Sequence, residues 1–200
     1  MKTRFMFSVP THLSRGEGKR AIAQVHTRSN GETVMRNTLF CAVLLSSMSP
    51  LAAAAGEVPE AIAAPGEKLV ATAHAVGAQI YECKADASGS QVWQFREPIA
   101  TLVIAGKTVG RHYAGPAWEL ADGSYVAGKV SGRAPSAGAS DIPLLKLDGV
   151  NGKGNGQLSE VTTIQRLNTR GGVAGGACDT AGALLNVPYT ADYAFYKKGE

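Results

Sequence analysis

Short stretches in which apolar and polar residues alternate run along the chain from residue 69 onward, and they restrict its fold more than any other feature. The stretches at 78–84, 91–96 and 161–168 are rich in β-branched and aromatic residues, which is typical of strands. Turn signals separate them at intervals of about 8–12 residues. No run of helical period with its caps is present beyond one turn at 180–185. The sequence therefore predicts an all-β fold with little helix, an antiparallel β-sandwich or barrel, in a single domain over residues 56–200.

Three hairpins follow from the turn signals. Their strands are expected at 78–84 with 91–96, at 99–104 with 108–113, and at 118–120 with 124–126. The third carries Asp122-Gly123, the strongest short hairpin signal in the chain. Residues 57–67, with two prolines, are expected to form an extended lead-in to the first strand.

The N-terminal part of the chain has the features of an export signal. A short basic start at Met35 is followed by an apolar run from Leu39 to Ala55 that ends in small residues, which predicts a cleaved signal peptide at 35–55. The alternative is a membrane anchor, but Ser and Pro50 interrupt the run, whereas a spanning helix needs about 20 largely apolar residues. Residues 1–34 are polar and Arg-rich, and we interpret them as an upstream or disordered extension, with Met1 or Met35 as the translation start. The predicted location is periplasmic or extracellular, with no stable membrane span after cleavage.

Removing this leader changes what the charge implies. Residues 1–55 hold 7 Lys and Arg against 2 Asp and Glu, a net charge of +5, whereas residues 56–200 hold 13 against 14, a net charge of −1. The overall charge of +4 therefore belongs to the leader. It gives no support for a nucleic-acid partner.

Two cysteines remain in the predicted mature chain, Cys83 and Cys178. Two thiols in an oxidising compartment most often pair, so we predict a disulfide between them that acts as a structural staple. The alternative is a pair of buried free thiols. No Cys-x-x-Cys motif indicates a redox function.

The candidate functional residues lie between Gly110 and Gly128. His112 with Glu119 or Asp122 is a candidate acid–base pair, because proton transfer needs only two groups in reach of each other. Tyr113 and Trp118 are candidate ligand contacts, together with His112 and Glu119, because Gly115-Pro116 turns the chain between the two aromatic residues. The alternative to these functional roles is a structural one: His112 makes a hydrogen bond within the fold, and Asp122 stabilises the hairpin turn.

Neither a cofactor nor a metal is expected. Gly106-Lys107-Thr108 lacks the first glycine of a phosphate-binding loop, and the glycines at 152–156 lack the spacing of a dinucleotide loop. A site made of two histidines and one carboxylate, His74, His112 and Glu119, stays open, although nothing in the spacing predicts it.

Several ordered motifs resemble those of a known family. They are Tyr81-Glu82-Cys83, Trp93-x-Phe95, Gly110-x-His112-Tyr113-Ala114-Gly115-Pro116-x-Trp118-Glu119, Asp122-Gly123-Ser124, Ile164-Gln165-Arg166-Leu167-Asn168-Thr169-x-Gly171-Gly172 and Cys178. Over about residues 57–197 the chain is similar to the secreted bacterial and fungal proteins grouped as domain of unknown function 3455 (DUF3455). The resemblance implies export and a single domain, and it supplies no catalytic residues.

Three functional hypotheses follow. The first is an exported module that binds a small molecule or carbohydrate. The second is a hydrolase-type enzyme that uses His112 with Glu119 or Asp122, and the third is a structural protein of the cell envelope. The oligomeric state and the ligand stay open.

Overall fold

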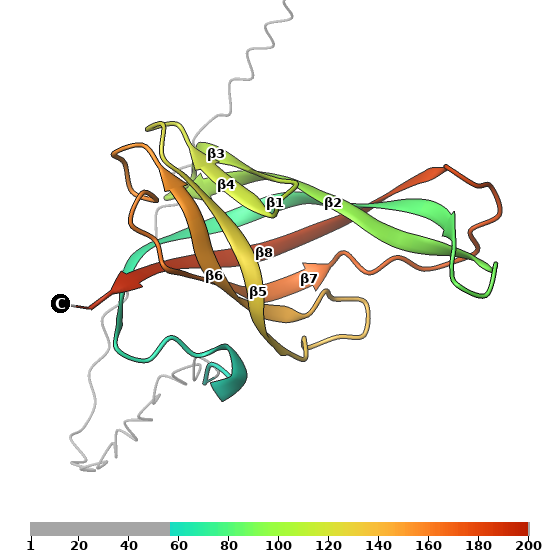
Figure 1. Ribbon diagram of the computed structural model, residues 1–200, viewed down its shortest axis with the longest axis horizontal. Helices are drawn as coiled ribbons and strands as arrows, with labels where there is room; N and C mark the ends of the chain where they lie inside the picture. The colour runs from blue at the N-terminus through green and yellow to red at the C-terminus, as the bar shows by residue number, and fades with distance from the viewer. Residues whose placement is uncertain (1–56, 200) are drawn as a thin grey trace, which may run out of the picture. The chain divides into compact units, whose positions relative to one another are not determined.

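Eight antiparallel strands close into a barrel in which every strand pairs with its neighbours in sequence (Figure 1). The computed structural model describes residues 57–199; the predicted signal peptide and the extension at 1–34 lie outside this range. The strands are β1 (Glu67–Ala85), β2 (Gln91–Ile104), β3 (Lys107–Tyr113), β4 (Ala117–Leu120), β5 (Tyr125–Ala134), β6 (Leu144–Lys153), β7 (Thr163–Gly171) and β8 (Leu184–Lys198). Pairing of β8 with β1 completes the ring. The predicted antiparallel all-β fold is confirmed, in its barrel form.

The three predicted hairpins are present as β1–β2, β2–β3 and β4–β5. Some strands are longer than expected, because the stretches 69–74 and 78–84 both belong to β1. The small residues between them weaken the alternation of the sequence without ending the strand. There β1 pairs with β2 on one side and β8 on the other, and Gly77 lies opposite both Ala100 and Tyr189. Main-chain pairing on both edges thus outweighs the local loss of pattern.

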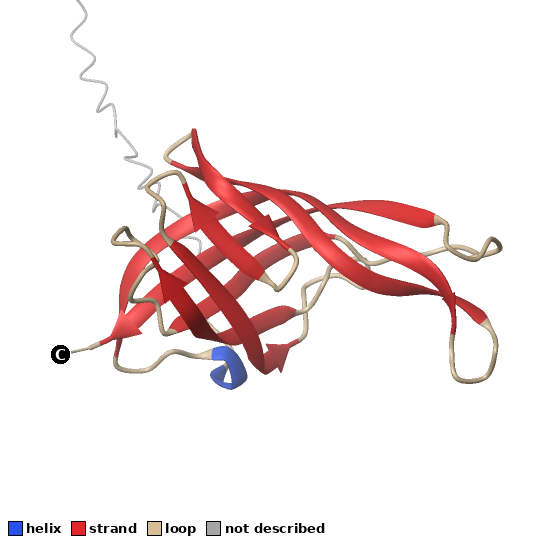
Figure 2. Ribbon diagram, turned by 45° about the horizontal axis from the view of Figure 1, so that its top comes forward, coloured by secondary structure: helices blue, strands red, loops and turns tan. Residues whose placement is uncertain are grey.

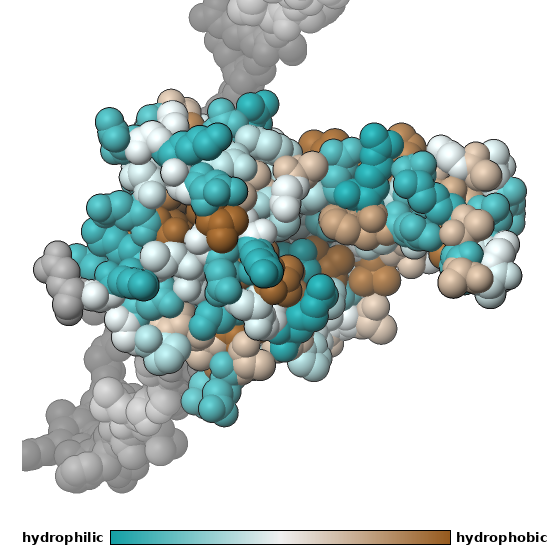
Figure 3. Space-filling view, viewed as in Figure 1, coloured by the Kyte–Doolittle hydropathy of each residue, from teal (hydrophilic) through white to brown (hydrophobic). Residues whose placement is uncertain are grey.

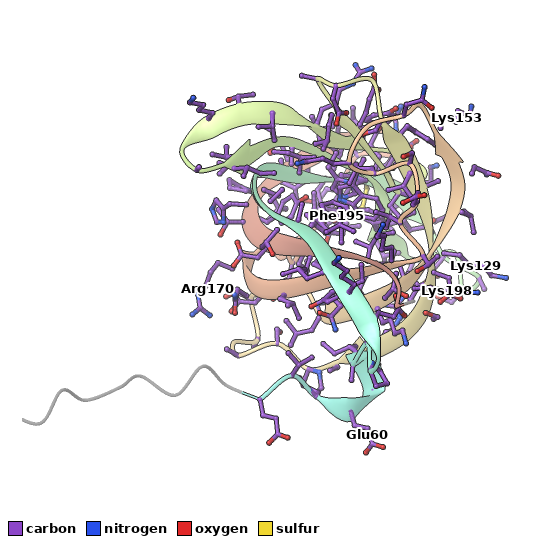
Figure 4. The ribbon with its side chains drawn as sticks, turned by 90° about the vertical axis from the view of Figure 1, so that its left-hand side faces the viewer. Glu60, Lys129, Lys153, Arg170, Phe195 and Lys198 are labelled. Carbon is purple, nitrogen blue, oxygen red and sulfur yellow. A yellow bond between two sulfur atoms is a disulfide. The ribbon has the colours of Figure 1, made fainter. Side chains whose placement is uncertain are left out.

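Alternate residues of each strand fill the inside of the barrel. The small side chains of Ala73 and Ala75 on β1 leave room for the large rings of Trp118, Tyr193 and Phe195, all fully buried. Trp118 packs edge-on against both rings, with centroids 5.1 Å from Tyr193 and 6.0 Å from Phe195. Figure 4 shows Phe195 among the packed interior side chains, while the labelled lysines point outward.

A short 3-10 helix, η1 (Glu60–Ile62), precedes the barrel and corrects the expectation that residues 57–67 are fully extended. Ile62 is completely buried, and its carbonyl accepts a hydrogen bond of 2.6 Å from Gln165 Nε2 on β7. Burial of the Ile62 side chain and the hydrogen bond to the Ile62 backbone carbonyl both favour the 3-10 turn. The sequence pattern around a single isoleucine is too short to reveal it.

The paired ends of β1, β2 and β8 extend beyond the barrel at one end (Figures 1 and 2). We call this part, formed by residues 81–95 and 173–186, the hairpin extension. The Cys83–Cys178 disulfide joins its two segments, which confirms the predicted pairing. Apolar side chains come to the surface where the hairpin extension leaves the barrel (Figure 3). Among residues 57–199, no helix is long and apolar enough to cross a bilayer.

Candidate functional site

A cavity of about 470 Å³ opens at the end of the barrel from which the hairpin extension projects. We call it the barrel-end cavity. Six of the strands contribute to it, as do the turn between β3 and β4 and the loop before β6. Its lining residues are Gln79, Tyr81, Phe95, Arg96, Pro98, His112, Ala114, Gly115, Pro116, Val130, Arg133, Ile142, Pro143, Leu145 and Arg166. Its volume lies within the range of about 300–1,000 Å³ that is typical of small-molecule sites.

His112 forms part of the inner wall of this cavity and is 2% exposed. Its ring lies parallel to that of Trp118, with centroids 4.5 Å apart. Nδ1 lies 2.8 Å from the carbonyl oxygen of Ala117, so Nδ1 carries the proton and donates it. Nε2 has no hydrogen-bond partner in the described part of the chain. Nε2 is therefore the nitrogen available to a ligand.

The imidazole of His112 is uncharged at neutral pH. Burial lowers the pKa of His112 to about 4, against the opposing effect of the hydrogen bond to Ala117. The positive charge of Arg166 adds to the lowering. Because Nδ1 holds the one proton of the neutral ring, Nε2 presents a lone pair and acts as a hydrogen-bond acceptor.

Arg166 is one of three arginines in the cavity wall. Its Nε and Nη2 groups donate hydrogen bonds of 3.1 and 2.9 Å to the carbonyl oxygen of Pro143, which fixes the loop before β6 against β7. Within residues 57–199 no carboxylate pairs with its guanidinium. The Arg166 charge therefore reaches neighbouring groups, where it favours the ionised form of the Tyr193 hydroxyl against the larger, opposite effect of burial on that pKa.

Gln79 adds an unused hydrogen-bond donor. The residue is 2% exposed and lines the cavity, and its buried Nε2 makes no hydrogen bond of good geometry among the described residues. The Tyr189 hydroxyl lies near enough for the Gln79 side chain to lower the pKa of Tyr189, against the larger effect of burial, but not at bonding geometry. A buried amide without a partner costs about 1–3 kcal/mol. A ligand or an ordered water that accepts from Gln79 Nε2 would remove this cost, so Gln79 is a candidate polar contact beside His112.

The structure does not bring His112 and Glu119 together. In the pairing of β3 with β4, His112 lies opposite Trp118 and Arg111 lies opposite Glu119. Paired residues share a face of the sheet, so His112 points into the barrel and Glu119 points outward. Glu119 Oε2 accepts hydrogen bonds from Arg111 Nη2 at 2.8 Å and from the Tyr113 hydroxyl at 2.9 Å, and these contacts lower its pKa.

Asp122 lies on the turn between β4 and β5, at the opposite end of β4 from the cavity. Its Oδ1 accepts from the backbone and hydroxyl groups of Ser124, and its Oδ2 accepts from the backbone of Gln157 at 2.9 Å. These bonds lower the pKa of Asp122, the hydroxyl of Ser124 most strongly. Asp122 thereby joins two loops, and the structure does not pair it with His112.

The two aromatic candidates also lie away from the cavity lining. Trp118 is buried behind His112. Tyr113 lies on the outer face, where Cζ of Arg111 is 4.9 Å from the centroid of the Tyr113 ring. The aromatic residues that do line the cavity are Tyr81 and Phe95, whose rings meet edge-on at 5.8 Å.

Sequence reasoning missed the other polar wall residues, Gln79 and Arg166. A signal for Arg166 was present, because strict alternation along β7 places it on the same face as Ile164, which is fully buried. An arginine on the core face of a strand is unusual and indicates a functional or bonding requirement. Nothing comparable marks Gln79.

No group of three metal-ligating side chains occurs among the residues that the structure describes. His74, from the open two-histidine hypothesis, is exposed on β1, and its Nδ1 lies 2.7 Å from Asp192 Oδ1. The structure does not bring it to His112 or Glu119.

Comparison with family models finds one described as "Protein of unknown function (DUF3455)", which matches residues 64–107 and 103–197. Comparison with curated proteins finds no match, and comparison with solved structures finds none either. The two matched segments together include all eight strands, from the start of β1 to Lys197, the last residue but one of β8.

Proposed function

The chain belongs to the DUF3455 family, whose description assigns no activity, and we propose from its geometry that it binds a small molecule in the barrel-end cavity. One observation carries this proposal. Two polar groups of the inner wall, Gln79 Nε2 and His112 Nε2, have no partner in the described chain, and both residues line the cavity. A donor and an acceptor set in an apolar wall are what a small-molecule site uses to orient its ligand.

The rest of the wall supplies apolar surface. Four residues from three strands, β1, β2 and β6, line the same space: Tyr81, Phe95, Pro98 and Leu145. Phe95 is 55% exposed, so its ring has surface to lose when a ligand binds. Burial of apolar area contributes about 25 cal/mol per Å². The cavity therefore favours a ligand with an apolar or aromatic body over a fully hydroxylated carbohydrate.

Binding fits the site better than the hydrolase hypothesis does. General acid–base catalysis needs a second proton-transferring group within hydrogen-bond reach of the substrate. No Asp or Glu is among the residues that line the cavity. Glu119 and Asp122, the acids considered for this role, hold other partners outside it.

Export remains part of this proposal. The Cys83–Cys178 disulfide supports it, because structural disulfides persist in oxidising compartments and are rare in the cytosol. Mass spectrometry of the exported protein, purified without reduction, tests it. A mass that starts near Ala55 or Gly56, lighter by two hydrogens, is expected. A mass that includes residues 35–55 would contradict cleavage.

A neutral fluorescent probe tests binding in the cavity. Phenylnaphthylamine is apolar, aromatic and uncharged, and its fluorescence increases when it leaves water. Val130 lines the cavity and is 38% exposed, so Val130→Trp is expected to fill part of the space and weaken probe binding by about tenfold or more.

Val150 provides the matched control. It lies on the neighbouring strand β6 and is 37% exposed, but it does not line the cavity. Val150→Trp adds the same side chain and is expected to leave probe binding unchanged. Equal binding to both variants and to the unaltered protein, or no binding at all, would overturn the proposal.

A further inference from the structure

We propose that the ligand of the barrel-end cavity is a small organic anion, in which a carboxylate or similar oxyanion group is attached to an apolar or aromatic body. This inference rests on the proposed function of the cavity and names the chemical class of the ligand. The charges of the wall carry it. Three arginines, Arg96, Arg133 and Arg166, line the cavity, and no acidic residue does.

Arg166 has donors to spare. A guanidinium carries five N–H groups in a fixed planar arrangement. Nε and Nη2 of Arg166 each donate to the carbonyl of Pro143, and these bonds orient the plane of the group. The guanidinium also lies near the Tyr193 hydroxyl, whose pKa it lowers against the larger effect of burial. The remaining N–H groups of a fixed guanidinium match the two oxygens of a carboxylate, and such charge-assisted pairs are about twice as strong as neutral hydrogen bonds.

Arg133 adds a second cation near the opening of the cavity. It lies near the end of β5, and within residues 57–199 its side chain makes no hydrogen bond and no ion pair. Arg96 is different, because its Nε lies 3.2 Å from Glu97 Oε1 and its charge is partly balanced. The uncompensated charge of the cavity therefore comes from Arg133 and Arg166.

The neutral state of His112 agrees with this charge distribution. A second cation beside Arg166 would add charge repulsion, whereas the neutral ring offers an acceptor and no charge. An anion bound near Arg166 would oppose that repulsion and favour protonation of the ring. An anionic ligand would therefore balance the arginine charges, since no residue of the cavity wall supplies a negative charge.

The apolar walls exclude a bare inorganic anion as the best ligand. Tyr81, Phe95 and Leu145 face the same space as the arginines, and phosphate or sulfate alone would leave their surface in contact with water. A molecule with an anionic end and an apolar body uses both parts of the wall.

A matched pair of probes tests the inference on the full chain. Anilinonaphthalene sulfonate and the neutral phenylnaphthylamine share the same ring frame and differ by the sulfonate. We expect the sulfonate to bind about 10- to 100-fold more tightly than the neutral probe, the range that corresponds to one or two charge-assisted hydrogen bonds. Its advantage is expected to shrink as salt is raised, since Arg133 is exposed to solvent.

Two variants test which arginines bind the sulfonate group of the probe. Arg166→Gln and Arg133→Gln are each expected to weaken the sulfonate by about tenfold and to leave the neutral probe within about twofold. Arg133 has no side-chain bond within residues 57–199, so its variant keeps the inference testable if Arg166→Gln fails to fold. Arg111→Gln is the control, because Arg111 pairs with Glu119 on the outer face of β3.

The outcomes separate this inference from the proposed function. If both probes bind with equal affinity and Val130→Trp weakens both, the cavity binds small molecules but the anionic class is wrong. If neither probe responds to Val130→Trp, the proposed function itself fails. Sulfonate binding that Arg111→Gln reduces as much as Arg133→Gln does would also overturn the inference, because the effect would then be one of total charge.

Discussion

The buried imidazole of His112 predicts a specific loss of stability in weak acid. In the unfolded chain a histidine takes up a proton near its ordinary pKa of about 6.5. In the folded protein burial lowers the pKa of His112 to about 4, so the ring stays neutral over the interval between. Between pH 6.5 and 4 the unfolded state therefore binds more protons than the folded state, and stability falls as the pH is lowered.

The size of the effect follows from the two pKa values. For a shift from 6.5 to about 4, linkage gives a loss of about 2 kcal/mol at pH 5 and about 3 kcal/mol at pH 4, relative to pH 8. Above pH 7 neither state is protonated and the contribution vanishes. Because a domain of this size is stable by about 5–15 kcal/mol, the loss is large enough to measure.

The assay is urea denaturation at pH 8, 5 and 4, comparing the unaltered chain with His112→Phe. Phenylalanine keeps an aromatic ring against Trp118, whose ring centroid is 4.5 Å from that of His112, but it cannot titrate. Protonation of carboxylates whose pKa values are lowered, such as Glu119 and Asp122, also destabilises the fold in acid. This loss of stability is the same in the unaltered chain and in His112→Phe. The difference between the two pH profiles therefore isolates His112.

We expect the unaltered chain to lose about 3 kcal/mol more than His112→Phe between pH 8 and 4. The variant starts from a lower stability at pH 8, because the Ala117 carbonyl loses the donor of a 2.8 Å hydrogen bond. Parallel profiles would refute the reasoning, since they would mean that the His112 ring is protonated in the fold at its ordinary pKa. An NMR titration of the His112 ring protons gives the folded pKa directly.

Three further predictions concern the disulfide, the core behind the site and the outer acid. Replacing Cys83 and Cys178 together by Ser removes a link of sequence separation 95 and is expected to cost up to about 4–5 kcal/mol in the chain-entropy model, measured by urea denaturation; an unchanged midpoint would contradict it. A Cβ at Gly128 would lie 2.9 Å from the ring of Trp118, so Gly128→Ala is expected to lower stability by about 1–3 kcal/mol, while Gly175→Ala, where nothing lies within 4 Å, leaves it unchanged in the same assay. Glu119→Gln is expected to leave the binding of both fluorescent probes unaltered, and a loss of binding would return this residue to the site.

The fold was predictable because its evidence is local. Alternation and turn chemistry, such as Asp122-Gly123 with a positive φ of 81° at the glycine, identify strands and hairpins one segment at a time. The choice between sandwich and barrel was not predictable, because it depends on the pairing of β1 with β8, whose residues lie more than 100 positions apart. Local pattern carries no information about that closure.

The differences between the predicted and the observed grouping of the candidate residues have the same origin. His112 and Glu119 are close in sequence, but a three-residue turn at 114–116 places Tyr113 opposite Ala117, and with them His112 opposite Trp118. This register sends the histidine inward and the acid outward. The length of the turn alone is enough to predict that His112 and Glu119 lie on opposite faces of the sheet. The grouping of Gln79, His112 and Arg166 cannot be predicted locally, because these residues come from β1, β3 and β7 and meet only in the closed barrel.

The same register supports the proposal of ligand binding over the hypothesis of proton transfer. Had β3 and β4 paired one residue differently, Glu119 would enter the barrel beside His112, raise its pKa and complete an acid–base pair. Instead Glu119 neutralises Arg111 outside, and the inner wall keeps the unbalanced charge of Arg166 next to a neutral imidazole. A wall with cationic donors, one neutral acceptor and no carboxylate has little means of moving a proton at neutral pH. These features agree with the proposal that the cavity holds an anion, and for that reason the arginine variants test it more directly than any variant of Glu119 or Asp122.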